Sequence, residues 1–139
     1  MDFNTFKLMY VSTMLFYQTI EHDIKFIYAY MHIGDINKHF AEIENKTLGQ
    51  MIRILEKLDN EDHNPLISAN DYNFLKQICD NRNHWAHKVF TEFLYGENWI
   101  NTQAYKKQCA KLEKDYLRIK DASSILEKIR IKYCTSIRN

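Results

Sequence analysis

Residues 3–32, FNTFKLMYVSTMLFYQTIEHDIKFIYAYMH, decide the fold class of this chain. Apolar side chains and one Thr recur in this stretch every three or four positions, at Phe6, Met9, Tyr10, Thr13, Phe16, Tyr17, Ile20, Ile24, Ile27, Tyr28 and Met31. An α-helix turns once in 3.6 residues, so this spacing gathers them on one face of a long helix. Gly34 is a natural end for that helix.

Three later segments repeat the helical spacing. Thr47 is a good N-cap for a short helix, which follows the polar stretch 35–45 and buries Leu48, Met51, Ile52, Leu55 and Leu58. After a charged loop from 59 to 65, Asn70 caps a third helix that ends near Gly96 and buries Phe74, Leu75, Ile78, Trp85, Val89 and Phe93. A fourth helix starts after Asn101, continues to about Tyr133 and buries Tyr105, Cys109, Leu112, Tyr116, Ile119, Ser123 and Leu126. The pattern predicts an all-α fold, an up-and-down bundle of four main helices.

The composition agrees with one helical domain over residues 1–139. Only 3 Gly and 1 Pro occur, too few for the turns of an all-β fold or of many short α/β units. The cysteines Cys79, Cys109 and Cys134 are widely separated, which favours reduced thiols over a zinc site or a redox motif. No run reaches the ~20 apolar residues that span a bilayer, so we expect a soluble, cytoplasmic protein without a membrane partner.

Charge is distributed unevenly along the chain. From Ala104 to Asn139 there are 10 Lys and Arg against 4 Asp and Glu, a net of +6, although the whole chain carries only +1. A basic helix of this kind attracts phosphate groups by screened Coulomb forces. We therefore predict that Lys106, Lys107 and Lys111 contact RNA.

Residues 82–87 form the densest chemical cluster of the chain: Arg82, Asn83, His84, Trp85, Ala86 and His87. Histidine is the side chain whose ordinary pKa lets it exchange protons near neutrality. An Arg beside a His suits phosphodiester cleavage, because the His moves a proton while the guanidinium neutralises charge on the phosphorane. RNA supplies its own nucleophile, the 2′-hydroxyl, so this chemistry needs no metal and no cofactor.

The spacing of this cluster predicts a dimer. Five residues at 100° each place Arg82 and His87 about 140° apart around an ideal helix. One helix therefore does not direct both side chains at one phosphate. A two-fold pair of such helices does, because each subunit then lends residues to a shared cleft.

The segment Arg82–His87 resembles the R-x4-6-H signature of the HEPN superfamily, including the polar residue that often follows its Arg, here Asn83. The order of elements is also similar: a long first helix, a short helix that opens with Thr47-Leu48-Gly49-Gln50, a motif-bearing third helix and a basic last helix. The resemblance covers nearly the whole chain in layout and about ten residues in motif.

The resemblance implies a metal-independent endoribonuclease that works as a homodimer. Arg82 and His87 would be catalytic, Asn83 would support the catalytic pair, and His84 would have at most a supporting role. Many relatives are toxins held by an antitoxin, often a small nucleotidyltransferase, and others act in phage defence. One such group carries a Tyr two positions after the His as a target for modification; Val89 stands at that position here, and Tyr95 lies further on.

Two alternatives follow from the same residues. Asp80, His84 and His87 fall at i, i+4 and i+7, so on a regular helix they would share a face that suits Zn²⁺, Mn²⁺ or Fe²⁺. A non-catalytic module that binds RNA, a nucleotide or a protein is the other alternative, with Trp85, Phe90 and Phe93 as a helical interface.

Overall fold

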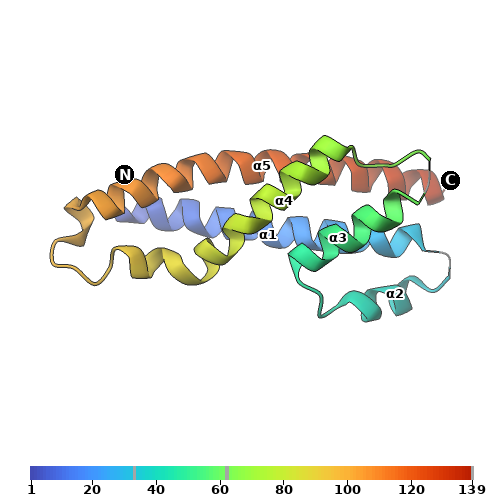
Figure 1. Ribbon diagram of the computed structural model, residues 1–139, viewed down its shortest axis with the longest axis horizontal. Coiled ribbons are helices and arrows are strands. Elements are labelled where there is room, and N and C mark those ends of the chain that lie inside the picture. The colour runs from blue at the N-terminus through green and yellow to red at the C-terminus, as the bar shows by residue number, and fades with distance from the viewer. Residues whose placement is uncertain (33, 62, 139) are drawn as a thin grey trace.

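A computed structural model describes residues 1–32, 34–61 and 63–138 of the chain, with side chains as far as Cys134. It contains the α-helices α1 (Phe3–Met31), α2 (Ile36–Ile43), α3 (Leu48–Asp59), α4 (Ala69–Asn83) and α5 (Gln103–Arg138) (Figure 1). No strand occurs in these ranges, so the all-α prediction is confirmed. Within the same ranges, no helix is both long enough and apolar enough to cross a membrane.

The helix α2 lies in the stretch 35–45, where the sequence pattern predicted a connection, so that prediction is wrong. Asp35 caps α2, because its side chain accepts a hydrogen bond from the backbone N–H of Asn37 at 3.0 Å. An eight-residue helix is marginal by itself. Contacts with α1 stabilise it: the rings of Phe26 and Phe40 lie 5.8 Å apart, and Ile43 is buried.

The presence of α2 changes how the first and last helices are oriented. Successive helices alternate in direction, and with five helices instead of four the first and last run parallel (Figure 1). The hydroxyl of Tyr105, near the start of α5, donates to the carbonyl of Met1 at 3.0 Å. Near the other end, Arg130 Nε lies 2.8 Å from Asp23 Oδ1. The predicted alternation is therefore present, but the bundle is built from five helices.

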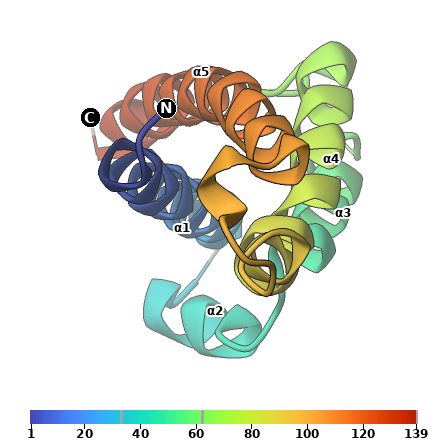
Figure 2. The same cartoon turned by 90° about the vertical axis from the view of Figure 1, so that its left-hand side faces the viewer.

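Figure 2 shows α1, α4 and α5 around a common core, with α2 at the edge of the molecule. The start of α1 and the segment after α4 meet in an aromatic cluster of Phe3, Phe6, Phe90, Phe93, Trp99 and Tyr105. At the other end of the core, the buried carboxylate of Asp59 accepts hydrogen bonds from the backbone N–H groups of Leu66 and Ile67 and from the hydroxyl of Tyr72. Asp59 thereby fixes the connection between α3 and α4. The helix α4 begins after its N-cap Ser68, two residues before the predicted N-cap Asn70.

Tyr72→Phe tests this buried contact. The hydroxyl of Tyr72 donates to Asp59 Oδ2 at 2.8 Å, and Tyr72 is only 1% exposed. Its loss should lower the free energy of unfolding by about 1–3 kcal/mol, the usual cost of leaving a buried charged acceptor short of a donor. Tyr95→Phe is the matched control, since Tyr95 is 89% exposed, and it should leave stability unchanged. Urea denaturation measures both; equal stabilities of the two variants would contradict the assigned role.

Candidate functional site

The segment 82–87 lies where α4 ends. The helix α4 stops at Asn83, and the chain continues through a π-helical turn, His84–Lys88, and a 3₁₀ turn, Val89–Glu92. The prediction of one continuous helix to about Gly96 is therefore wrong. The backbone N–H of Val89 donates to the carbonyl of His84, five residues back, in place of the carbonyl of Trp85 that an α-helix would use.

Tyr10 on α1 contacts the backbone of this turn. Its hydroxyl donates to the carbonyl of Trp85 at 2.8 Å. The carbonyl that Val89 does not use is therefore bound by a side chain from another helix. Burial raises the pKa of Tyr10, so its phenol keeps the proton that it donates.

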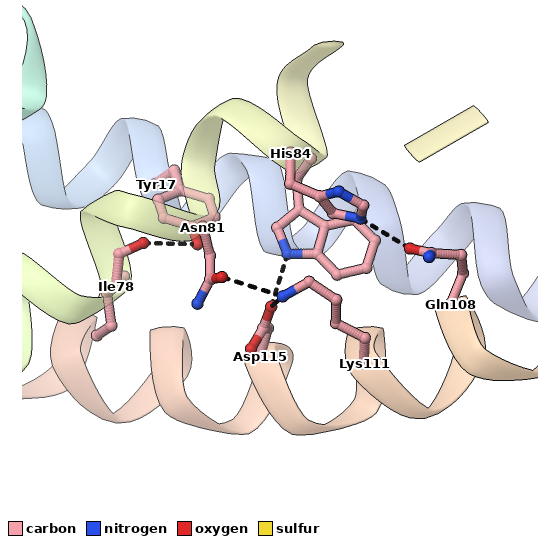
Figure 3. A network of polar contacts seen from close by, with 8 residues as sticks. Tyr17, Ile78, Asn81, His84, Gln108, Lys111 and Asp115 are labelled. Atoms are coloured by element: carbon pink, nitrogen blue, oxygen red, sulfur yellow. Dashed lines mark hydrogen bonds and ion pairs between the residues drawn. The ribbon is translucent and has the colours of Figure 1, made fainter. Parts of the chain in front are cut away.

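Trp85 fixes the turn from its other side. The indole is fully buried, and its Nε1–H donates to Asp115 Oδ2 on α5 at 2.9 Å. Lys111 Nζ also donates to Asp115 Oδ2, at 2.8 Å, and to Asn81 Oδ1, at 3.0 Å (Figure 3). The same amine lies 5.5 Å from the Trp85 ring centre. Asp115 and Lys111 therefore form a polar link that ties α4 and the π-helical turn to α5.

The network assigns a structural role to His84. Its Nε2 lies 2.7 Å from Gln108 Oε1 on α5, and its ring packs edge-on against Trp85 (Figure 3). His84 is partly buried between these neighbours. The Nε2 atom of His84 is therefore engaged within the fold.

Arg82 points toward α1 instead of toward His87. Its guanidinium lies 3.8 Å from a carboxylate oxygen of Glu21, and the Arg82 side chain is 32% exposed. Glu21 also pairs with Lys25, at 3.3 Å. The positive charge of Arg82 reaches the Cys79 thiol too, where it opposes the rise in pKa that burial and Asp80 cause. Sequence analysis gave no sign of Glu21 as its partner, because the two residues are distant along the chain.

His87 and Asn83 lie on the surface of the motif. Both are exposed, and within the described part of the chain His87 makes no hydrogen bond or ion pair. No such bond joins Arg82 to His87 among those residues either, so one chain does not bring the two side chains together.

The structure bears on both alternatives from the sequence. Among the described residues, no three His, Cys, Asp or Glu side chains gather as a metal would require. The metal site on Asp80, His84 and His87 assumed a regular helix, and the π-helical turn breaks that register. Trp85 and Phe93 are buried in the core and do not form the exposed interface expected of them, while the binding module itself stays a prediction.

The three predicted RNA-binding lysines fall into two groups. Lys106 and Lys107 are exposed on the first turns of α5 and remain a prediction. Lys111 is partly buried and held by Asp115 and Asn81, so its amine is already occupied inside the protein. The three lysines look alike in the sequence, because the burial of Asp115 depends on packing between distant helices.

Lys111→Ala and Lys107→Ala form a matched pair that tests this division. Lys111→Ala should lower the free energy of unfolding by about 1–2 kcal/mol, because it leaves the 6%-exposed carboxylate of Asp115 without its cation. Lys107→Ala removes the same charge from an exposed position and should change stability by less than about 0.5 kcal/mol. Thermal melting monitored by circular dichroism measures both. Equal melting temperatures would show that Lys111 is as dispensable to the fold as Lys107.

Comparisons with family models, with curated proteins and with solved structures returned no match for the chain.

Proposed function

We propose that the chain is a metal-independent endoribonuclease of HEPN type, which cleaves RNA by 2′-hydroxyl attack at a site shared by two subunits. The observation that carries the proposal is His87: an exposed imidazole, free of hydrogen bonds in the described part of the chain, on a turn whose neighbouring side chains are fixed.

The rigidity of the turn gives this observation its weight. Trp85 and Val89 on either side of His87 are buried, and Tyr10 holds the carbonyl of Trp85. The fold thus maintains an irregular backbone there, yet makes no use of the imidazole that this backbone presents. Irregular π-helical turns are frequent at functional sites, and catalytic groups require a rigid support of this kind.

Arg82 has the properties of a phosphate-binding group that is paired with a carboxylate while no RNA is bound. Its contact with Glu21 is long, 3.8 Å, and the guanidinium remains partly exposed. A partly exposed ion pair of this length is weak, so an RNA phosphate can replace Glu21 at modest cost. Arginine then binds two phosphate oxygens through its planar fork.

The proposed reaction includes two proton transfers: one proton leaves the 2′-hydroxyl, and one is given to the 5′-oxygen. A histidine takes the proton of the 2′-hydroxyl, and the 2′-oxygen attacks the phosphorus to form the new bond. The bond from phosphorus to the 5′-oxygen breaks, a second histidine protonates that leaving oxygen, and a 2′,3′-cyclic phosphate remains. Each chain offers one exposed His87, so a two-fold pair supplies both the base and the acid, and Arg82 neutralises the phosphorane.

The resemblance also suggests a biological setting. We propose a toxin or phage-defence effector, controlled by an antitoxin such as a small nucleotidyltransferase. Val89 is buried in the core, so the position at which some relatives carry a modifiable Tyr is inaccessible here. Tyr95, in contrast, is 89% exposed.

Arg82→Ala and His87→Ala test the chemistry. Each should reduce cleavage of RNA by at least ~10²-fold without unfolding the chain, since positioned proton-transfer groups and charge-stabilising donors contribute on that scale. Cleavage should persist in EDTA and leave a 2′,3′-cyclic phosphate, as followed by gel electrophoresis of labelled RNA. His63→Ala, which truncates another exposed histidine, is the control and should retain full activity. Full activity of His87→Ala would refute the catalytic assignment.

The shared site makes a second prediction. Light scattering should give about twice the chain mass of 16.8 kDa. An excess of His87→Ala chains, allowed to exchange subunits with the unaltered chain, should suppress cleavage, because a mixed dimer carries one His87 and lacks either the base or the acid. A monomer at micromolar concentration, or a mixture that keeps all the activity of its unaltered chains, would count against a site formed across the dimer.

A further inference from the structure

Two neighbouring hollows lie along α1, and we call them together the trough. The first, of about 650 Å³, lies between α1 and α2 and is lined by Glu21 and Lys25 among others. The second, of about 440 Å³, lies between α1 and α5 and is lined by Asp23 and Arg130 among others. Gln18 and His22 line both hollows, so the two lie side by side on α1. Each has the size of an ordinary small-ligand site.

The first hollow is linked to the proposed catalytic arginine through one lining residue. Glu21, which lines the first hollow, is the ion-pair partner of Arg82. An RNA strand whose phosphate displaces Glu21 from Arg82 therefore enters the trough with its neighbouring nucleotide. The far end, between α1 and α5, is then a place for a base.

The far end contains an unsatisfied buried acceptor. Asp23 is 5% exposed; its Oδ1 lies 2.8 Å from Arg130 Nε, a charge contact without hydrogen-bond alignment, and its Oδ2 has no hydrogen-bond partner. Burial raises the pKa of Asp23, and Arg130 opposes that rise. A buried carboxylate oxygen without a donor is destabilising, and no described side chain or backbone group donates to Oδ2.

Arg130 and two apolar side chains complete the surroundings. The Arg130 side chain is 32% exposed, and its guanidinium carbon lies 5.9 Å from the centre of the Phe26 ring. Leu15 and Phe26 also line this hollow. The far end thus combines an acceptor, the donors of a guanidinium and an apolar wall. A cationic ligand would be repelled by Arg130 and an anion by Asp23, so a neutral planar group with a donor beside an acceptor fits best.

We propose that Asp23 and Arg130 bind the edge of an unpaired RNA base at this end of the trough. Oδ2 has almost no solvent-accessible surface in the free chain, so the Asp23 side chain, which lines the hollow, turns on binding and Oδ2 accepts an N–H of the base. Arg130 donates to the adjacent carbonyl or ring nitrogen, and Leu15 and Phe26 cover the ring. Unstacked bases are recognised through such edges and apolar contacts. The subsite rests on the proposed ribonuclease function, because it places the base on a strand that also reaches Arg82.

A pair of oligonucleotides isolates the base edge. The first oligonucleotide is a strand of five 2′-deoxyuridines, which lacks the 2′-hydroxyl and cannot be cleaved by the proposed reaction. The second is the same strand with every base methylated at N3, so it keeps all phosphates but loses the N–H donor. The methylated strand should bind at least ~10-fold more weakly in fluorescence anisotropy, because Asp23 is then left without a donor. Equal affinities, or no binding of either strand, would overturn the subsite.

Variants assign that preference to the named residues. Asp23→Leu should bind both strands with equal affinity, and Arg130→Gln should bind the unmethylated strand more weakly. Lys128→Gln removes the same charge from an exposed position two residues away and should keep both the affinity and the preference. If Asp23→Leu fails to fold, the comparison of Arg130→Gln with Lys128→Gln still tests the subsite. Equal effects of these two substitutions on the affinity for the unmethylated strand would overturn it.

The two proposals fail in different ways. A chain that prefers the unmethylated strand but never cleaves RNA would refute the ribonuclease and retain the base subsite. A chain that cleaves RNA through Arg82 and His87 but binds both strands equally would refute the subsite alone.

Discussion

The hydrogen bond from Tyr10 to the carbonyl of Trp85 is the contact on which the functional segment depends. A π-helical turn shifts the backbone hydrogen bonds by one residue, so the N–H of Val89 binds the carbonyl of His84 in place of that of Trp85. Tyr10 donates to the Trp85 carbonyl from the helix that packs beside the turn. The buried indole of Trp85, bonded to Asp115, holds the same residue from the opposite side. Two long helices thus hold Trp85: α1 binds its backbone carbonyl, and α5 binds its indole ring.

These contacts divide the segment 82–87 into residues that hold the structure and residues that remain accessible. His84 and Trp85 are committed to Gln108 and Asp115 on α5. His87 and Asn83 are left on the surface, and Arg82 rests on Glu21. In the function we propose, the first group sets the position of the turn and the second performs chemistry. Two ion pairs join these surroundings to α1: Arg82 with Glu21, and Arg130 with Asp23. They mark the two ends of the path along which we place the RNA.

Helical periodicity predicted much of the fold, and its errors have physical causes. The ranges of α1, α3 and α5 follow from apolar spacing and N-caps, which are local properties of the chain. The helix α2 was missed because its short, polar segment becomes helical by packing onto α1. The third helix was predicted too long, because Trp85, Val89 and Phe93 keep an apolar spacing through the π-helical and 3₁₀ turns. Periodicity detects burial and does not distinguish these helix types.

The sequence by itself determined the helical class, the approximate ranges of α1 and α3, the start of α5 and the chemical segment Arg82–His87, because residue type and spacing along one chain are sufficient for these. Only the tertiary structure decided which members of that segment are available. It buries Trp85, ties Lys111 to Asp115, directs Arg82 to Glu21 and leaves His87 exposed. Each of these outcomes depends on a partner from another helix, distant along the chain. Spacing within one helix cannot specify such a partner, because it is the packing of the helices that brings the two residues together.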